Sequence, residues 1–216
     1  MPPSTLTPHR HHDPLHRNWA DYYQAVQGRP PRETLLLALD RFDQEALPTP
    51  TARAVDLGCG DGRDTVEILR RGWSVLAIDK EAEALARLTQ RSSLDFSNLE
   101  TQIQAFETLV LPAEVNLINA SFCLQFCPQG QFPEFWAKVV AALKPGGRFS
   151  GQLIGDRDSW AAYPNLSVHT RPQVEALFSN FKFDYFEEEE HPGQTALGET
   201  KHWHIFQIVA RKQASP

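Results

Sequence analysis

Glycine and aspartate are concentrated in one stretch of the sequence, AVDLGCGDGRDT, at residues 54–65. A short apolar run leads into Gly58, Gly60 and Gly62, and such a loop allows positive φ and lets a ligand touch the main chain. The dinucleotide-binding pattern is G-x-G-x-x-G, but Arg63 stands where its third glycine belongs. The stretch therefore predicts a nucleotide-like ligand in a loop that departs from the NAD pattern.

The acids of this loop favour a cationic ligand over a diphosphate. Asp56 and Asp61 would repel a pyrophosphate, because like charges a few ångströms apart are costly in a partly desolvated site. S-adenosylmethionine carries a sulfonium and an ammonium and no phosphate. We therefore expect S-adenosylmethionine as the cofactor, with S-adenosylhomocysteine as its product, in preference to NAD(P).

A further acid, Asp79, ends the apolar run VLAID. In an open α/β sheet the ligand lies outside the carboxyl ends of the strands, and an acid about 20 residues past the glycine loop binds the ribose hydroxyls. Asp79 also suits the N-cap of a following helix. With the glycine loop before it, we expect the ribose role.

Two histidines, His202 and His204, are the candidates for a catalytic base. We expect the last strand to run antiparallel to the others, so its first residues reach the edge that holds the glycine loop. Neighbouring strand residues point to opposite faces, so the two histidines share one side and Trp203 takes the other. A structural or surface role for both histidines is the alternative.

An aromatic segment, WADYYQAVQGRPP, offers a second wall for the site. We expect Trp19, Tyr22 and Tyr23 to form a lid that keeps the site dry, with Arg29 pairing a carboxylate of cofactor or substrate. Simple packing of the aromatic residues is the alternative. The candidate substrate contacts are Trp19, Tyr23, Arg29 and Trp160.

Strands and helices alternate along most of the chain and would position these residues. The predicted strands are 53–58, 74–79, 100–106, 115–120, 148–154, 182–188 and 203–211. The predicted helices are 62–71, 81–91, 132–143 and 172–179, preceded by one or two helices within 19–42 that break at residues 28–31. This pattern predicts an α/β fold with a Rossmann-like, doubly wound, seven-stranded sheet. The sheet is mostly parallel with an antiparallel last strand, and helices cover both faces.

The chain divides by composition into three parts. We expect a flexible tail at 1–17, a helical lid and linker at 18–50, and one catalytic domain at 51–216. The net charge of −6 gives no overall basic field, so we expect neither nucleic acid nor a membrane as partner. No apolar stretch reaches the roughly 18 residues of a membrane span, and the start lacks the apolar core of a signal peptide. We therefore expect a cytoplasmic protein.

The cysteines are sparse. Cys123 and Cys127 form a lone C-x-x-x-C, for which buried thiols are favoured over a metal site. We expect no metal. The sequence does not indicate the oligomeric state.

Three segments resemble the class I S-adenosylmethionine-dependent methyltransferases: AVDLGCGDG, VLAIDKE and LKPGGRF at 143–149. Together with NLINASFCLQF, these segments are similar to the small tellurite-resistance-type methyltransferases. The resemblance implies that the cofactor contacts are Asp56, Gly58, Cys59, Gly60, Asp79, Lys80, Ala105, Phe106 and Ser121.

The implied roles divide along the cofactor. Asp56 and Ser121 would lie by the methionine moiety, which the glycine loop lines, and Asp79 would bind the ribose. Ala105 stands where an adenine-binding acid is common, so the adenine contact would come from main chain at Ala105 and Phe106 or from the Gln104 side chain.

The resemblance implies an enzyme that transfers a methyl group in line to a small-molecule acceptor, for which alignment and exclusion of water suffice. A thiol, a metalloid oxyanion and a small carboxylic acid all remain open as acceptor. No N-P-P-Y or D-P-P-Y motif follows the fourth strand, so methylation of nucleic-acid bases is not expected. The alternative is a sensor or interaction protein that binds S-adenosylmethionine without turnover.

Overall fold

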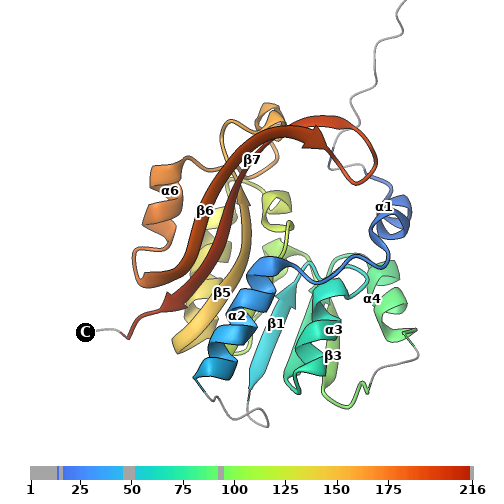
Figure 1. Cartoon of the computed structure of the whole chain (residues 1–216), viewed down its shortest axis with the longest axis vertical. Coiled ribbons are helices and arrows are strands. Elements are labelled where there is room, and N and C mark those ends of the chain that lie inside the picture. Colours follow the sequence, from blue (N-terminus) through green and yellow to red (C-terminus); the bar gives the residue numbers. More distant parts are fainter. Residues whose placement is uncertain (1–13, 15–16, 46–51, 92–94, 215–216) are drawn as a thin grey trace, which may run out of the picture.

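The sheet at the centre of the molecule fixes where the site can form (Figure 1). The computed structural model describes residues 14, 17–45, 52–91 and 95–214. Its seven strands lie in the order β3-β2-β1-β4-β5-β7-β6. The pairs among β1 to β5 are parallel, and β7 runs antiparallel to both of its neighbours. The predicted Rossmann-like sheet with an antiparallel last strand is therefore confirmed.

The elements follow the predicted alternation. The strands are β1 (Arg53–Leu57), β2 (Ser74–Asp79), β3 (Leu99–Ile103), β4 (Val115–Ala120), β5 (Leu143–Ile154), β6 (Phe181–Gln194) and β7 (Thr200–Lys212). The α-helices are α1 (Trp19–Val26), α2 (Glu33–Gln44), α3 (Arg63–Arg70), α4 (Ala82–Thr89), α5 (Phe132–Ala142) and α6 (Arg171–Leu177).

Helices cover both faces of the sheet because alternate strand residues point to opposite sides. In β1, Val55 packs into the apolar cluster that includes α5, whereas Ala54 packs into the cluster that includes α2. Four of the five residues of β1 are buried. The strand that leads into the glycine loop is thus held on both sides, which gives the loop a rigid base.

The N-terminal segment forms two helices with different tasks. They break between Val26 and Glu33, as predicted, and Gly28 there adopts a positive φ of 75°. Leu35 and Leu39 of α2 are buried against the sheet, so α2 is a covering layer of the fold and not part of a lid. Of these two helices, α1 is the one whose residues line the cavities described below. Most of the predicted tail and of the predicted linker lies outside the described residues.

The predicted strands 182–188 and 203–211 were too short. β6 and β7 pair from Phe181 with Lys212 out to Gln194 with Thr200, so the connection shrinks to residues 195–199. The acidic run 187–190 and Pro192 are unfavourable in a central strand, but β6 is an edge strand, where charge and proline are tolerated. The long hairpin arches over the sheet towards α1 (Figure 1).

Candidate ligand-binding site

The glycine loop leaves β1 with a bare main chain. Gly58 and Gly60 adopt positive φ of 59° and 56°. A Cβ at Gly58 would lie 2.4 Å from the Cβ of Cys123, so no side chain fits there. The Cys59 amide donates to the Ile78 carbonyl (3.1 Å), which ties the loop to the end of β2. The loop therefore presents main chain, not side chains, to its surroundings.

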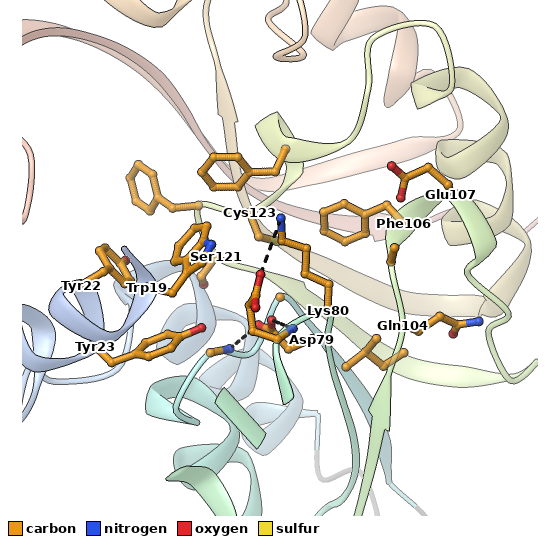
Figure 2. A pocket seen from close by; sticks show the side chains of 17 residues that line it. Trp19, Tyr22, Tyr23, Asp79, Lys80, Gln104, Phe106, Glu107, Ser121 and Cys123 are labelled. Carbon is orange, nitrogen blue, oxygen red and sulfur yellow. Dashed lines mark hydrogen bonds and ion pairs between the residues drawn. The ribbon is translucent and has the colours of Figure 1, made fainter. Parts of the chain in front are cut away.

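A cavity of about 830 Å³, counting its open mouth, lies between the glycine loop and α1 (Figure 2). We call it the loop cavity. Seven of the predicted cofactor residues line it: Gly58, Gly60, Asp79, Lys80, Ala105, Phe106 and Ser121.

Asp79 links the loop to the end of β2. One carboxylate oxygen accepts from the Gly60 amide and the other from the Glu81 amide, both at 2.9 Å. Burial raises the pKa of the Asp79 carboxyl, although both main-chain bonds favour its charged form. Because α4 begins at Ala82 with Glu81 as its N-cap, Asp79 is not the cap of that helix. Its carboxylate faces the loop cavity (Figure 2).

A recess next to the loop cavity contains two buried acids, Asp56 and Asp64, together with Cys59 and Ser121. We call it the acid recess. The Asn119 amide donates to both carboxylates, at 2.9 Å to Asp56 and 3.1 Å to Asp64. Burial, and then the charge of Asp64, raise the pKa of Asp56 to about 7. The free protein therefore holds a carboxyl group that ionises near neutral pH.

Asp64 is a site residue that the sequence analysis did not assign. It lies in the first turn of α3, where an acid ordinarily serves only the helix dipole. In the structure Ser121 donates to it (2.6 Å), and so does the main-chain amide of Arg32 (3.0 Å). Asp61 borders the same recess, but its carboxylate is paired with Arg91 at 3.0 Å.

A second cavity, of about 790 Å³ with its mouth, lies under the tip of the β6–β7 hairpin. We call it the hairpin cavity. Among the predicted substrate residues, Trp19, Arg29 and Trp160 line it, whereas Tyr23 lines the loop cavity and the acid recess. The residues shared by the hairpin and loop cavities are Trp19, Tyr22, Phe122 and Phe126. We call these four the aromatic junction.

The aromatic junction is tightly packed. Trp19 stands edge-on to Phe126, with ring centroids 5.4 Å apart, and edge-on to Tyr22 at 5.6 Å. Phe122 directly follows Ser121 and adopts a positive φ of 50°, which is uncommon for a bulky residue. Such strain is found where the surrounding structure needs a side chain in one place.

The predicted placement of His202 and His204 is wrong. Neither histidine lines the loop cavity or the hairpin cavity, whereas Trp203 between them lines the hairpin cavity. His204 is fully buried on the other face and contacts Glu188 at 3.0 Å, and His202 contacts Glu190 at 3.0 Å. The alternation along β7 is as predicted, but the face that meets the cavity carries Trp203.

The three cysteines are free and buried, as predicted for Cys123 and Cys127. Burial raises the pKa of Cys127 to about 12 and raises those of Cys59 and Cys123 as well, so all three remain thiols at neutral pH. Within the described part of the chain, no cluster of three His, Cys, Asp or Glu residues could hold a metal ion. None of the described helices is long and apolar enough to span a membrane.

Comparison with known sequences identifies the central segment. Residues 54–147 match a family model described as a methyltransferase domain. The chain is 29% identical over 111 residues to trans-aconitate 2-methyltransferase of Deinococcus radiodurans, covering 50% of this chain and 40% of that protein. It is 27% identical over 150 residues to Hemagglutinin 1 of Eikenella corrodens, covering 69% and 47%. The chain therefore spans less than half the length of these two relatives.

Comparison with solved structures identifies the fold. TehB from Haemophilus influenzae superposes with a TM-score of 0.67 at 15% identity, covering 82% of this chain and 61% of that one. The 1,6-didemethyltoxoflavin-N1-methyltransferase of Burkholderia thailandensis, solved with bound 1,6-didemethyltoxoflavin and S-adenosylhomocysteine, gives a TM-score of 0.61 at 20% identity and covers 90% of this chain and 85% of that one. Residues 54–147 are therefore similar to methyltransferase domains, and the chain has the fold of the class I S-adenosylmethionine-dependent methyltransferases.

Proposed function

We propose that the protein transfers a methyl group from S-adenosylmethionine, held in the loop cavity, to a small molecule held in the hairpin cavity. The observation that carries this proposal is the aromatic junction, where the two cavities meet between Trp19, Tyr22 and Phe122. A donor and an acceptor on either side of it would face each other in a setting from which water is excluded.

The residues of the loop cavity suit this cofactor. The carboxylate of Asp79, fixed by two main-chain amides, keeps lone pairs that can accept from ribose hydroxyls. Ala105 and Phe106 border the cavity beyond it, where an adenine ring would lie against the apolar surface. An ammonium group would find the carboxylates of Asp56 and Asp64 in the acid recess, which Arg32 and Arg63 also line.

The bound cofactor supplies a methyl group that is already activated for transfer. The chain then needs to align the acceptor and keep it dry, which the rigid rings of the aromatic junction can do. We assign no base role to His202 or His204, because both lie away from the two cavities. Small-molecule acceptors are supported by the names of two similar proteins, which specify trans-aconitate and 1,6-didemethyltoxoflavin for those enzymes.

The experiment that tests this function is calorimetric titration with S-adenosylmethionine, S-adenosylhomocysteine and NADH, followed by a screen of small acceptors for release of S-adenosylhomocysteine. We expect micromolar binding of the two adenosyl ligands, no binding of NADH, and turnover with at least one acceptor. Binding of NADH alone would overturn the assignment of the loop cavity. Binding of the adenosyl ligands with no turnover across the screen would instead favour a sensor.

A further inference from the structure

The hairpin cavity is lined by positive charge. Three arginines line it, Arg17, Arg29 and Arg32, and none of its described lining residues is an aspartate or glutamate. The whole chain has a net charge of −6, so this cavity is opposite in sign to the molecule as a whole. Such a local field concentrates anions.

Two of these arginines have no counter-ion. Among the described residues, neither Arg29 nor Arg32 makes an ion pair or a side-chain hydrogen bond. The guanidinium of Arg32 instead lies over the ring of Phe122, 4.4 Å from its centroid, at the aromatic junction. Arg32 is partly buried, and the desolvation of its charge lowers its pKa, whereas Arg29 is exposed. An anionic ligand would relieve this cost.

Several arginines elsewhere in the fold are paired with carboxylates. Arg148 binds Glu45 and Asp184, and Arg157 binds Glu188 and Glu190. Arg32 is only partly exposed and has no such partner among the described residues, which indicates that its guanidinium is available to a ligand. Arginine is well suited to that task, because its planar donors match the two oxygens of a carboxylate.

Arg17 closes the far side of the cavity. Its side chain is 8% exposed, and its nearest carboxylate oxygen, of Glu199, is 3.8 Å away. The guanidinium lies 5.3 Å from the Trp160 ring centroid and 5.4 Å from that of Tyr22. It therefore adds charge to a wall that is otherwise aromatic.

The walls of the cavity are flat rings. Trp160 lies 5.8 Å from Trp203 and 6.2 Å from Phe126 between ring centroids. Behind them, Lys201 and Asp158 form a buried ion pair, and the lysine ammonium lies 4.0 Å from the Trp160 ring. This ion pair positions the two tryptophans, and Asp158 neutralises the charge of Lys201. A planar ligand body can lie against the exposed faces of such rings.

One buried acceptor in the cavity lacks a donor. Gln125 is 3% exposed, its amide nitrogen donates to the Phe122 carbonyl (2.7 Å), and its side-chain oxygen has no partner among the described residues. Buried polar atoms without a partner are rare in native structures. An N–H or O–H group on the ligand would satisfy this oxygen.

The described residues that line the cavity include no strong general base. Of these residues, only Tyr22 and His191 could take up a proton, and His191 is exposed, 3.0 Å from the Pro192 carbonyl. A hydroxyl or amine acceptor would need a base, whereas a carboxylate is already ionised at neutral pH.

We propose that the acceptor is a flat organic carboxylate, anchored by Arg29 and Arg32, and that the product is its methyl ester. This inference rests on the proposed function. In the transfer, a carboxylate oxygen contributes the electron pair of the new oxygen–carbon bond, and the sulfur keeps the pair of the broken sulfur–carbon bond. The products are a neutral ester and S-adenosylhomocysteine, and no proton has to be removed.

The test titrates flat carboxylates into the protein saturated with S-adenosylhomocysteine. The probes are benzoate, cinnamate and indole-3-acetate, each paired with its primary amide, and indole-3-acetate is also paired with its N-methyl analogue. We expect at least one carboxylate to bind ten times or more tightly than its amide and to give a methyl ester with S-adenosylmethionine. The N-methyl analogue should bind more weakly than indole-3-acetate, because Gln125 then lacks its donor.

Matched variants locate the effect. Arg32→Gln and Arg29→Gln should each weaken carboxylate binding at least tenfold without changing amide binding, whereas Arg32→Lys should retain part of it. Arg70→Gln is the control. Arg70 is exposed on α3 and lines neither cavity, and its substitution changes the net charge by the same amount as Arg32→Gln or Arg29→Gln. The main-chain bond from Arg32 to Asp64 survives these substitutions.

The outcomes separate the two proposals. If S-adenosylhomocysteine binds but every amide binds as tightly as its carboxylate, or Arg32→Gln loses no more affinity than Arg70→Gln, the carboxylate acceptor is overturned and the methyltransferase stands. If S-adenosylhomocysteine itself does not bind to the wild-type protein, the proposed function fails first.

Discussion

At the scale of single residues, the site uses carboxylates for two different purposes. Asp79 is fixed by two main-chain amides, which define where its remaining lone pairs point. Asp56 is buried beside a second acid, Asp64, and the pair can hold a proton or a cation. The carboxylate of Asp79 thus offers hydrogen-bond acceptors in a fixed orientation, whereas the carboxylates of Asp56 and Asp64 offer negative charge.

Loss of the Asp79 carboxylate should weaken binding of the cofactor. We expect Asp79→Ala to raise the dissociation constant of S-adenosylhomocysteine at least tenfold, because hydrogen bonds to a charged acceptor contribute about 1.5–3 kcal/mol. Calorimetry measures this, and Glu100→Gln, an exposed acid on β3, is the control. An unchanged constant in Asp79→Ala would mean that the ribose does not lie there.

The raised pKa of Asp56 makes cofactor affinity depend on pH. Below about pH 7 the free protein holds a proton on Asp56, and a bound ammonium group favours the ionised form. Affinity should therefore rise with pH between about 6 and 7 and level off above, with protons released on binding at pH 6. Calorimetry in buffers of different ionisation enthalpy measures that release. A pH-independent affinity would contradict the cation-binding role of the acid recess.

The same shift affects folding with a definite sign. An unfolded aspartate ionises near pH 3.9, whereas Asp56 in the folded protein keeps its proton up to about 7. Between these values the folded state binds more protons than the unfolded state, so the free energy of unfolding falls as pH rises. In Asp56→Asn that decline should become shallower, as measured by urea denaturation at pH 5 and pH 7.5.

Sequence reasoning at this scale could place a residue in the fold where its neighbours in the chain define its position. The glycine loop and Asp79 could be found because the strand before each of them fixes its place at the sheet edge. Asp64 and Arg32 could not be found in this way, because in the sequence they look like an ordinary first-turn residue and an ordinary cap residue. Their place in the site depends on contacts with Ser121, Phe122 and the hairpin, which form only in the fold. The pleat of β7 predicts that His202 and His204 point to one face of the sheet and Trp203 to the other. It does not predict which of the two faces meets the cavity.

At the scale of elements, α1 is the least secure wall of the site. It has eight residues, which is too short for an isolated helix to be stable in water. Asn18 caps it, and only Tyr23 and Val26 of the helix are buried. Helix α2, in contrast, has five buried residues against the sheet. Opening of α1 should therefore cost much less free energy than opening of α2.

Ligand binding should protect α1 selectively. We expect amide hydrogen exchange across residues 19–26 to slow about tenfold or more with saturating S-adenosylhomocysteine, because Trp19, Tyr22 and Tyr23 line the loop cavity. Exchange across residues 33–44 should not change and serves as the internal control. Equal protection of both helices, or of neither, would show that α1 is not a ligand-dependent cover.

The lengths of elements are harder to derive than their order. β6 extends through glutamates and Pro192 because its partner β7 supplies main-chain bonds and Arg157 and Arg171 supply charge. The two arginines lie outside both strands, so the pattern of the strand residues alone does not indicate them. The short reach of β3, which ends at Ile103 and not at the predicted 106, reflects the turn at Phe106–Thr108 under the loop cavity.

At the scale of the whole molecule, the ligands should stabilise the fold by mass action. A ligand that binds only the folded chain at 100 times its dissociation constant adds about 2.7 kcal/mol to the free energy of unfolding. For a chain of this size each kcal/mol corresponds to about 2–4 °C in Tm. S-adenosylhomocysteine should therefore raise Tm by about 5 °C or more in a thermal scan, whereas NADH should not.

The sheet itself was predictable from sequence, since buried apolar strands alternating with helical patterns admit few arrangements. What the sequence could not show is that the hairpin and α1 enclose a common space (Figure 1). That enclosure joins segments more than 130 residues apart in the chain, Trp19 and Trp160 among them. It depends on contacts that no local pattern records.

The positions of the tryptophans in this fold allow intrinsic fluorescence to report ligand binding. Trp19, Trp160 and Trp203 line the cavities, whereas the other two of its five tryptophans, Trp73 and Trp136, are buried in the core. The indoles at the cavities change their surroundings when a ligand enters, and the two in the core contribute a constant emission. Titration of either cavity can thus be read from intrinsic fluorescence without any label.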